Sequence, residues 1–544
     1  MRSRPLFIST AASAVAALAV ALPSIWWQPL NVDEDLVVRI STQPLAAIVD
    51  VVWGSRGGGP VHFFLEHATL QWPGGLIGLR APSLLFFLLA LPPVALVARE
   101  LAGERAALFV VPAFAISPLA VHYSTLGRPT VVLLAGATWA LWLALRAGRL
   151  GGHGRWALAG VALGALVYVH PLAPLYGGAG LLAALLHARG PFRRAARDAW
   201  PAPVAFALAG LPYYLHTLDV LSQRYDVGLG NPQGRTYFGG SVWRNALGAL
   251  APGPLTVVLV VLAALGFVLL LRDRWPTAVG VALYPAVPIA FFSLVPAGGR
   301  SAVFFNRYVL PALPVFLVLV AVGALALARL AGRHRLTVVG AVLGTVLAVE
   351  GVYDLAWLNE LRRLDLPRVA AAAGRDAEDA VLFASTGAVA DRGPTDELTG
   401  ARPAALVANY VALADRKVQL VDETGCAAAK AFLATRAQPR RGVWLFYELD
   451  PVAAQAGAER LRGVRGVRVT VLSQRYVLAR SRRASDPASL LALGVRLRKA
   501  WLRHAPDDAA ARTVLAVDRA GLDASWNCLP SAERLAKSLA RRAP

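Results

Sequence analysis

Runs of apolar residues recur along the first two thirds of the chain, separated by mostly short polar segments. A membrane-spanning helix needs about 20 predominantly apolar residues, and about eleven runs approach that length. The pattern predicts a polytopic α-helical membrane protein. The expected spans lie near 6–27, 81–98, 106–121, 130–146, 156–171, 172–189, 200–216, 254–271, 276–296, 308–330 and 335–353. The segment 51–80 is less apolar, and we expect it to lie in a loop.

After Tyr353 the pattern changes to short runs rich in Val, Leu and aromatic residues, which are typical of strands. Such runs alternate with helix-like segments, and this alternation favours an α/β arrangement. We therefore expect a transmembrane domain over 1–353, with an outer loop at about 28–80, and an α/β domain over 354–544. The expected strands lie near 380–385, 442–449 and 466–479, and the expected helices near 426–437, 451–464, 487–505 and 507–522.

Basic residues are unevenly distributed between the two sets of loops. If the N-terminus is cytoplasmic, the inside segments hold about 16 Lys and Arg in about 48 residues, and the outside loops hold about 9 in about 115 residues. This asymmetry predicts a cytoplasmic N-terminus, and eleven spans then place the C-terminal domain outside. The first run follows the basic residues of Met1–Arg4; it is longer than a usual signal-peptide core, which favours an uncleaved helix.

Composition agrees with a membrane protein, because 56% of the residues are hydrophobic and 16% are charged, against roughly 25% charged in soluble domains. The net charge of +22 follows mostly from the basic inside loops, so it does not predict a nucleic-acid partner. The two cysteines, Cys426 and Cys528, have no metal-ligand spacing. A disulfide between them is one alternative, and nothing in the sequence decides it.

Three adjacent carboxylates, Asp33, Glu34 and Asp35, follow the first apolar run directly. They can be a solvated polar loop next to interfacial tryptophans. They can also be a site, because a carboxylate at a bilayer surface can act as a general base on a hydroxyl group. The expected topology places them on the outer side, where the long loops lie.

Three further segments follow in order on the same side of the expected membrane. They are "LRAPS" at 79–83, "SPLAVHYSTLGR" at 117–128 and "NRYVLPALP" at 306–314. Together with the acidic cluster they resemble the GT-C type integral-membrane glycosyltransferases of family 39, the protein O-mannosyltransferase and aminoarabinose-transferase type. The resemblance covers about 350 residues. Members of that family use a polyprenyl-phosphate sugar as donor and often carry an outer C-terminal domain.

The resemblance implies a role for several residues. Asp33 is the expected general base, and Glu34 is expected to orient the acceptor. Arg128 and Arg307 are expected to bind the donor phosphate, although arginines near the ends of spans also snorkel to lipid headgroups. The candidates for the substrate pocket are Tyr123, His62 and Tyr308.

The chain departs from the family pattern at two places. Gly58 and Gly59 stand where the family often has His-Pro, with His62 where a tyrosine is usual, and Thr130 stands where a tyrosine is usual. These departures leave the sugar, the acceptor and activity itself open. The spacing of His62, Glu66 and His67 can suggest a metal, but a juxtamembrane amphipathic segment is the simpler interpretation. We identify no metal ligands and no required cofactor, and the need for a divalent cation stays open.

The expected function is transfer of a hexosyl or pentosyl group, with inversion, from a polyprenyl-phosphate donor to an envelope protein, lipid or polysaccharide. The expected location is the outer face of a bacterial plasma membrane, since a composition rich in Ala, Gly and Arg is typical of GC-rich bacterial genomes. One alternative is a transporter or flippase for a lipid-linked sugar, which would need ionisable residues inside the spans, where few occur. The other is an inactive scaffold of the same fold. Oligomeric state stays open.

Overall fold

The structure of the protein is a computed structural model. It describes residues 3–27, 32–53, 59–71, 76–226, 240–251, 253, 255–294, 306–363, 366–376, 380–384, 407, 411, 418–422, 432–433, 439–448, 451–472 and 476–504. At some helix positions only the backbone is described, and Asp33 and Asp35 are among these. Gly58, Cys426 and Cys528 lie outside the described residues.

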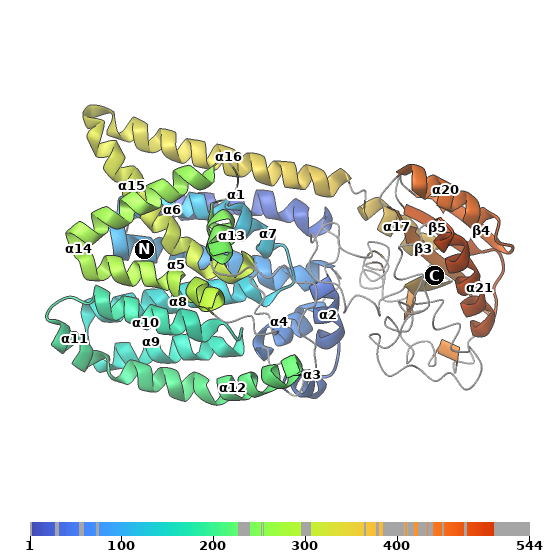
Figure 1. Ribbon diagram of the computed structural model, residues 1–544, viewed down its shortest axis with the longest axis horizontal. Coiled ribbons are helices and arrows are strands. Elements are labelled where there is room, and N and C mark those ends of the chain that lie inside the picture. The colour runs from blue at the N-terminus through green and yellow to red at the C-terminus, as the bar shows by residue number, and fades with distance from the viewer. Residues whose placement is uncertain are drawn as a thin grey trace.

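A bundle of apolar helices forms the N-terminal part of the chain, and a small sheet with helices lies beside one end of it (Figure 1). The long helices of the bundle are α1 (Arg4–Trp27), α5 (Leu76–Ala102), α6 (Glu104–Ala115), α8 (Pro129–Leu150), α9 (His153–Ala165), α10 (Ala173–His187), α12 (Pro201–Asp226), α14 (Leu255–Leu294), α15 (Leu313–Leu330) and α16 (Arg335–Arg363). The shorter elements are α2 (Val32–Ser41), α3 (Leu45–Val51), α4 (Pro60–Leu70), α7 (Pro118–Ser124), η2 (Leu166–Tyr168), α11 (Phe192–Ala199), α13 (Gly240–Leu250), η3 (Asn306–Ala312) and η4 (Gly332–His334).

Six helices in the described part of the chain are long and apolar enough to cross a membrane. The pair α6 and α7, bent by 52°, makes a seventh if it is one span. Each of the eleven expected segments overlaps a helix, but the number eleven itself stays a prediction. The chain is a multi-pass helical membrane protein. The six spans are Arg4–Ile25, Ile77–Ala102, Pro129–Leu150, Leu255–Leu294, Asn306–Leu330 and Thr337–Ala356.

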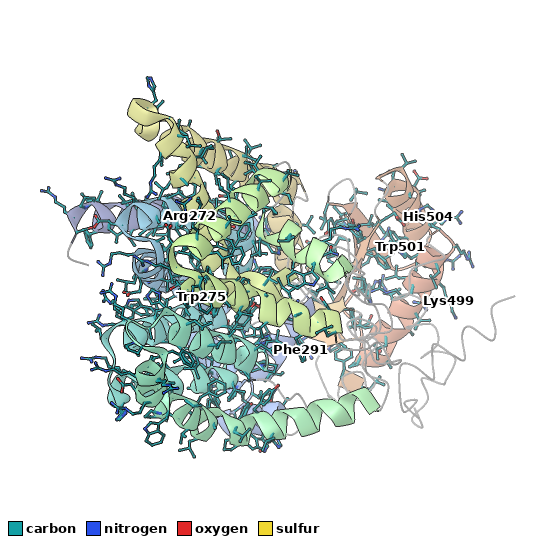
Figure 2. The ribbon with its side chains drawn as sticks, turned by 60° about the vertical axis from the view of Figure 1, so that its left-hand side comes forward. Arg272, Trp275, Phe291, Lys499, Trp501 and His504 are labelled. Atoms are coloured by element: carbon teal, nitrogen blue, oxygen red, sulfur yellow. The ribbon has the colours of Figure 1, made fainter. Side chains whose placement is uncertain are left out.

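The helix α14 has 40 residues and is interrupted at Arg274, whose φ of −149° and ψ of 66° are not helical. A straight helix of that length would measure about 60 Å, twice the hydrocarbon core of a bilayer. Arg272 and the 64% exposed Trp275 flank the break (Figure 2). The break lies inside the polar segment 272–275, where the sequence predicts the boundary between two spans.

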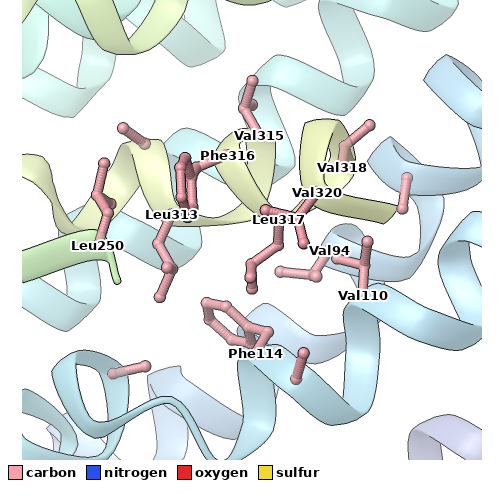
Figure 3. Close-up of a cluster of buried hydrophobic side chains, with 14 of the residues drawn as sticks. Val94, Val110, Phe114, Leu250, Leu313, Val315, Phe316, Leu317, Val318 and Val320 are labelled. Carbon is pink, nitrogen blue, oxygen red and sulfur yellow. The ribbon is translucent and has the colours of Figure 1, made fainter. Parts of the chain in front are cut away.

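The core of the bundle lies where α5, α6 and α15 meet. Val94, Phe114 and Leu317 point into it from these three helices (Figure 3). The helices α14 and α15 approach closely, because a Cβ added at Gly266 would lie 2.0 Å from the carbonyl oxygen of Leu319. Small residues at such crossings allow the close van der Waals packing that holds membrane helices together.

The expected loop over 51–80 is wrong in detail, because most of its described residues are helical. The amphipathic helix α4 packs against α2, with Phe63 and Leu70 facing Val37 and Ile40 in one buried cluster. These helices have 10 and 11 residues. An apolar stripe of that length is too short to stand out in a search for spans, so the segment resembles a loop in sequence.

The C-terminal part contains a five-stranded sheet in the order β2-β1-β3-β5-β4. The strand β1 is parallel to β2 and β3, whereas β5 is antiparallel to β3 and β4. The expected run at 466–479 covers β4 and the start of β5. The bounds are β1 (Ala380–Ala384), β2 (Gln419–Asp422), β3 (Arg441–Tyr447), β4 (Val467–Val471) and β5 (Tyr476–Ser481).

Helices cover both faces of this sheet, and its side chains alternate accordingly. Trp444 and Phe446 of β3 face α20 (Pro451–Arg462) and α21 (Pro487–Leu502), and Leu445 faces α17 (Leu366–Asp376). Trp501 of α21 packs against Phe446 with ring centroids 4.9 Å apart (Figure 2). The helix α16 continues past the expected domain boundary to Arg363, so the division into two domains stays a prediction.

Candidate functional site

The acidic cluster lies in the first turn of the helix α2 and not in a loop. Carboxylates at a helix N-terminus are stabilised by the helix dipole. The helix packs through Val37 and Ile40 onto α4, which leaves the acidic turn beside the end of α1. Glu34 is fully buried, and the side chains of Asp33 and Asp35 are not described.

Glu34 forms a bidentate ion pair with Arg80 of α5. The Nε and Nη2 atoms of Arg80 each donate to one oxygen of the Glu34 carboxylate, both at 2.8 Å. Nη1 of Arg80 donates to the carbonyl oxygen of Ile25 at 2.7 Å. Both charged side chains are fully buried. Parallel guanidinium–carboxylate bonds are strong and geometrically specific, so this pair joins α1, α2 and α5.

Glu34 and His62 bind the two backbone groups of one residue, Gly127. The N–H of Gly127 donates to Oε1 of Glu34 at 2.8 Å, and Nε2 of His62 lies 3.3 Å from the carbonyl oxygen of Gly127. A carbonyl oxygen only accepts, so Nε2 carries the proton. Burial lowers the pKa of His62 to about 3, against the opposing effect of this hydrogen bond. The imidazole is therefore neutral over the physiological range.

Arg128 follows Gly127 and occupies the N-cap position of α8 in an extended conformation, with Pro129 as the first helical residue. Its backbone is held by Ser83 of α5. The Ser83 hydroxyl donates to the carbonyl oxygen of Arg128 at 3.2 Å and accepts from its N–H at 3.4 Å. The guanidinium group of Arg128 is thus carried by a turn whose backbone is bound by buried side chains.

Arg307 reaches the same region from η3. Its Cζ lies 5.6 Å from the ring centroid of Tyr308. The Tyr308 ring lies 6.2 Å from the ring of His170. Burial lowers the pKa of His170 to about 3, and the charges of Arg307 and Arg128 lower it further. Both arginines expected to bind a phosphate therefore act electrostatically on one histidine.

The remaining sequence-predicted residues lie on elements next to this cluster. Tyr123 is buried on α7, a helix that contacts α8 and η3. Thr130 is buried in the first turn of α8. A Cβ added at Gly59 would lie within 2.4 Å of the backbone of Tyr168 and Val169. The departure from the family pattern at Gly59 thus allows α4 to begin directly against the chain that leads to His170.

Sequence reasoning assigned no role to Arg80 and none to Glu66. Glu66 is fully buried, and neither of its oxygens has a hydrogen-bond partner. Burial raises the pKa of Glu66 well above its usual range, and the charge of Glu34 raises it further. Among the described residues, no group of three His, Cys, Asp or Glu side chains is arranged to hold a metal ion. The sequence carries no signal that Glu66 is buried, because its spacing also fits a polar residue at the edge of an amphipathic helix.

Comparisons with known proteins place this arrangement in a known fold. Residues 60–212 match the family model described as dolichyl-phosphate-mannose-protein mannosyltransferase. Crystal structures of ArnT from Cupriavidus metallidurans, in the apo state and bound to undecaprenyl phosphate, match with TM-scores of 0.51 and 0.50. Both share 16% sequence identity with this chain and cover 86% of it and 97% of the ArnT chain.

No curated protein matches the sequence. The resemblance to GT-C type glycosyltransferases is nevertheless confirmed, through the fold over most of the chain and the family model over residues 60–212. That matched segment includes His62, Glu66, Arg80 and Arg128. It does not include Asp33, Glu34 or Arg307, so the roles of these three residues depend on the geometry of this chain.

Proposed function

We propose that this chain, a multi-pass membrane protein of the GT-C fold, transfers a sugar from a polyprenyl-phosphate donor to an envelope acceptor. The observation that carries the proposal is the 2.8 Å bond from the N–H of Gly127 to Glu34, because it joins the neighbour of Arg128 to the neighbour of Asp33. The charges of Arg128 and Arg307 also act on one histidine, His170. Two arginines from distant parts of the chain create positive charge where a departing phosphate needs it. The bound undecaprenyl phosphate in the ArnT structure supports the same class of donor lipid.

In the proposed reaction the carboxylate of Asp33 takes the proton of an acceptor hydroxyl. The hydroxyl oxygen attacks the anomeric carbon and forms the new glycosidic bond. The bond from that carbon to the phosphate oxygen breaks, and its electron pair leaves with the polyprenyl phosphate. The attack comes from the face opposite the phosphate, so the configuration inverts. Arg128 and Arg307 stabilise the charge on the departing phosphate.

The two oxygens of Glu34 already bind Arg80 and the N–H of Gly127. We therefore assign Glu34 to positioning and not to contact with the acceptor. Tyr123, His62 and Tyr308 stay candidates for the substrate region. Of these, Tyr308 has the guanidinium group of Arg307 over its ring.

We place the reaction on the outer face of a bacterial plasma membrane. Support comes from α10, which begins just after His170 at the site and ends at His187. The helix α11 follows there, with Arg193, Arg194 and Arg197 exposed. Basic loops favour the cytoplasmic side, which supports a site on the opposite face.

One observation favours the transporter alternative. Glu350 lies inside the span Thr337–Ala356 and is 1% exposed, whereas the sequence shows few ionisable residues in the spans. Buried ionisable residues in spans often mark transport pathways. The test of function therefore measures both the transfer of a sugar and its movement across the bilayer.

The test uses the full chain in proteoliposomes with a panel of labelled polyprenyl-phosphate sugars. We expect the wild type to release label from one donor and Asp33→Asn to do so at least about a hundredfold more slowly, as for loss of a general base. Asp35→Asn, on the same helix, is the matched control and should keep the wild-type rate. Equal rates for wild type and Asp33→Asn would remove Asp33 as the base. Movement of intact donor across the bilayer without release of label would support a transporter. The absence of both release and movement would support a scaffold.

A further inference from the structure

Glu34 directly follows Asp33 on α2, and it is bound to the residue that directly precedes Arg128. Its Oε1 accepts the N–H of Gly127 at 2.8 Å across 93 positions of sequence. The residue next to the proposed base is therefore bonded to the residue next to a proposed phosphate ligand. Because the bond is buried, water does not compete for it, and the two segments are held at one separation.

The turn that carries Arg128 is bound by side chains from three helices. Glu34 of α2 holds the N–H of Gly127, and His62 of α4 faces its carbonyl oxygen. Ser83 of α5 binds both backbone groups of Arg128. The fit is tight, because a Cβ added at Gly127 would lie 2.8 Å from the carbonyl oxygen of Leu79.

Arg80 holds Glu34 in this position. Two of its guanidinium nitrogens bind the carboxylate, and the third binds the carbonyl oxygen of Ile25 at the end of α1. A lysine cannot reproduce this geometry, since an ammonium group is a point charge without the planar fork. The orientation of the Glu34 carboxylate thus depends on the shape of Arg80 as well as on its charge.

We propose that Glu34 and Arg80 are positioning residues that hold the acceptor base Asp33 and the donor-phosphate ligand Arg128 at a fixed separation. This inference rests on the proposed function, because the separation matters for catalysis only if Asp33 is the base and Arg128 binds the donor phosphate. The positioning itself is a property of the described contacts and can be tested without a donor. The alternative is that the buried pair only stabilises the fold.

The test compares Glu34→Gln and Arg80→Lys with Glu100→Gln. The control breaks a different ion pair, Glu100 with Arg149 at 2.9 Å, whose Arg149 side chain is 34% exposed. The first readout is the rate at which phenylglyoxal modifies Arg128 in the purified full chain, followed by mass spectrometry of its peptides. We expect a severalfold faster modification of Arg128 in both test variants and the wild-type rate in the control.

The second readout is the kinetics of sugar transfer, and here we expect a higher KM for the donor together with a lower kcat in both test variants. Positioning is overturned if Arg128 keeps its reactivity and the donor KM is unchanged while the thermal midpoint falls, because the pair then only stabilises the fold. If Arg128 becomes more reactive but the wild type transfers no sugar, the positioning stands and the proposed function fails.

Discussion

His62 and Glu66 face each other one turn apart on α4, with Nε2 of the histidine 3.7 Å from Oε1 of the glutamate and both side chains fully buried. Burial lowers the pKa of His62 and raises the pKa of Glu66. The His62 imidazole is therefore neutral near neutral pH, and its contact with Glu66 is not an ion pair. The pair lies near the charged pair of Glu34 and Arg80, since the charge of Glu34 acts on Glu66.

The first prediction concerns acid stability. The pKa of His62 falls from 6.5 to about 3 on folding, so the folded state excludes a proton that the unfolded state binds. Stability from this group is complete above pH 6.5 and is lost as the pH falls toward about 3, by up to about 1.4 kcal/mol per pH unit. His62→Gln keeps a donor for Gly127 and should remove this loss. Thermal midpoints in detergent between pH 3 and 7 test it, and an unchanged acid slope in the variant would contradict it.

The second prediction concerns the stability of the fold as the pH rises. The pKa of Glu66 is raised above 4.5 in the folded state, so stability from this group is complete below pH 4.5 and is lost as the pH rises. Between pH 4.5 and 6.5 the effects of Glu66 and His62 oppose each other. Glu66→Gln should therefore raise the thermal midpoint above pH 6.5 and remove the decline there. A lower midpoint for Glu66→Gln at pH 8 would show that the ionised carboxylate is needed.

The third prediction concerns the cost of leaving Glu34 without its partner. Arg80→Ala leaves a buried carboxylate, and the loss of one partner of a buried pair typically costs about 3–5 kcal/mol. Arg480→Ala, the control, breaks the pair with Asp376, whose two side chains are 27% and 31% exposed, and we expect a cost of about 1 kcal/mol or less. Thermal unfolding followed by circular dichroism measures both. Equal decreases in the thermal midpoint of the two variants would mean that burial of the Glu34 pair does not increase the cost of losing its arginine.

The fourth prediction concerns Gly127. A Cβ at this position would meet the side chain and the carbonyl oxygen of Leu79 at 2.7–2.8 Å, and a backbone atom cannot move aside as a flexible side chain can. We expect Gly127→Ala to cost about 1–3 kcal/mol by overpacking and to raise the donor KM. Gly178→Ala on α10, where nothing lies within 4 Å, is the control and should leave both quantities unchanged or slightly improve stability. A donor KM unaffected by Gly127→Ala would argue that Arg128 tolerates displacement.

Several features could be predicted from the sequence, because the pattern of apolar and polar residues along a short segment determines them. The apolar runs predicted the helices of the bundle and the break near Arg274, and the short runs rich in Val, Leu and aromatic residues around Trp444 and Leu478 predicted strands of the C-terminal sheet. The order of short motifs predicted the family resemblance. The short helices α2 and α4 were missed, because ten or so residues with a narrow apolar stripe resemble a polar loop.

Sequence by itself determined which segments are apolar enough to enter a membrane, which are polar, and that Asp33, Arg128 and Arg307 belong to candidate motifs. Only the tertiary structure decided that Glu34 is buried against Arg80, 46 positions away, and that the charges of Arg128 and Arg307 both act on His170. The reason is physical. Helix periodicity and hydropathy report on neighbours within a few turns, whereas an ion pair between α2 and α5 depends on how whole helices pack, and that packing leaves no periodic trace at either residue.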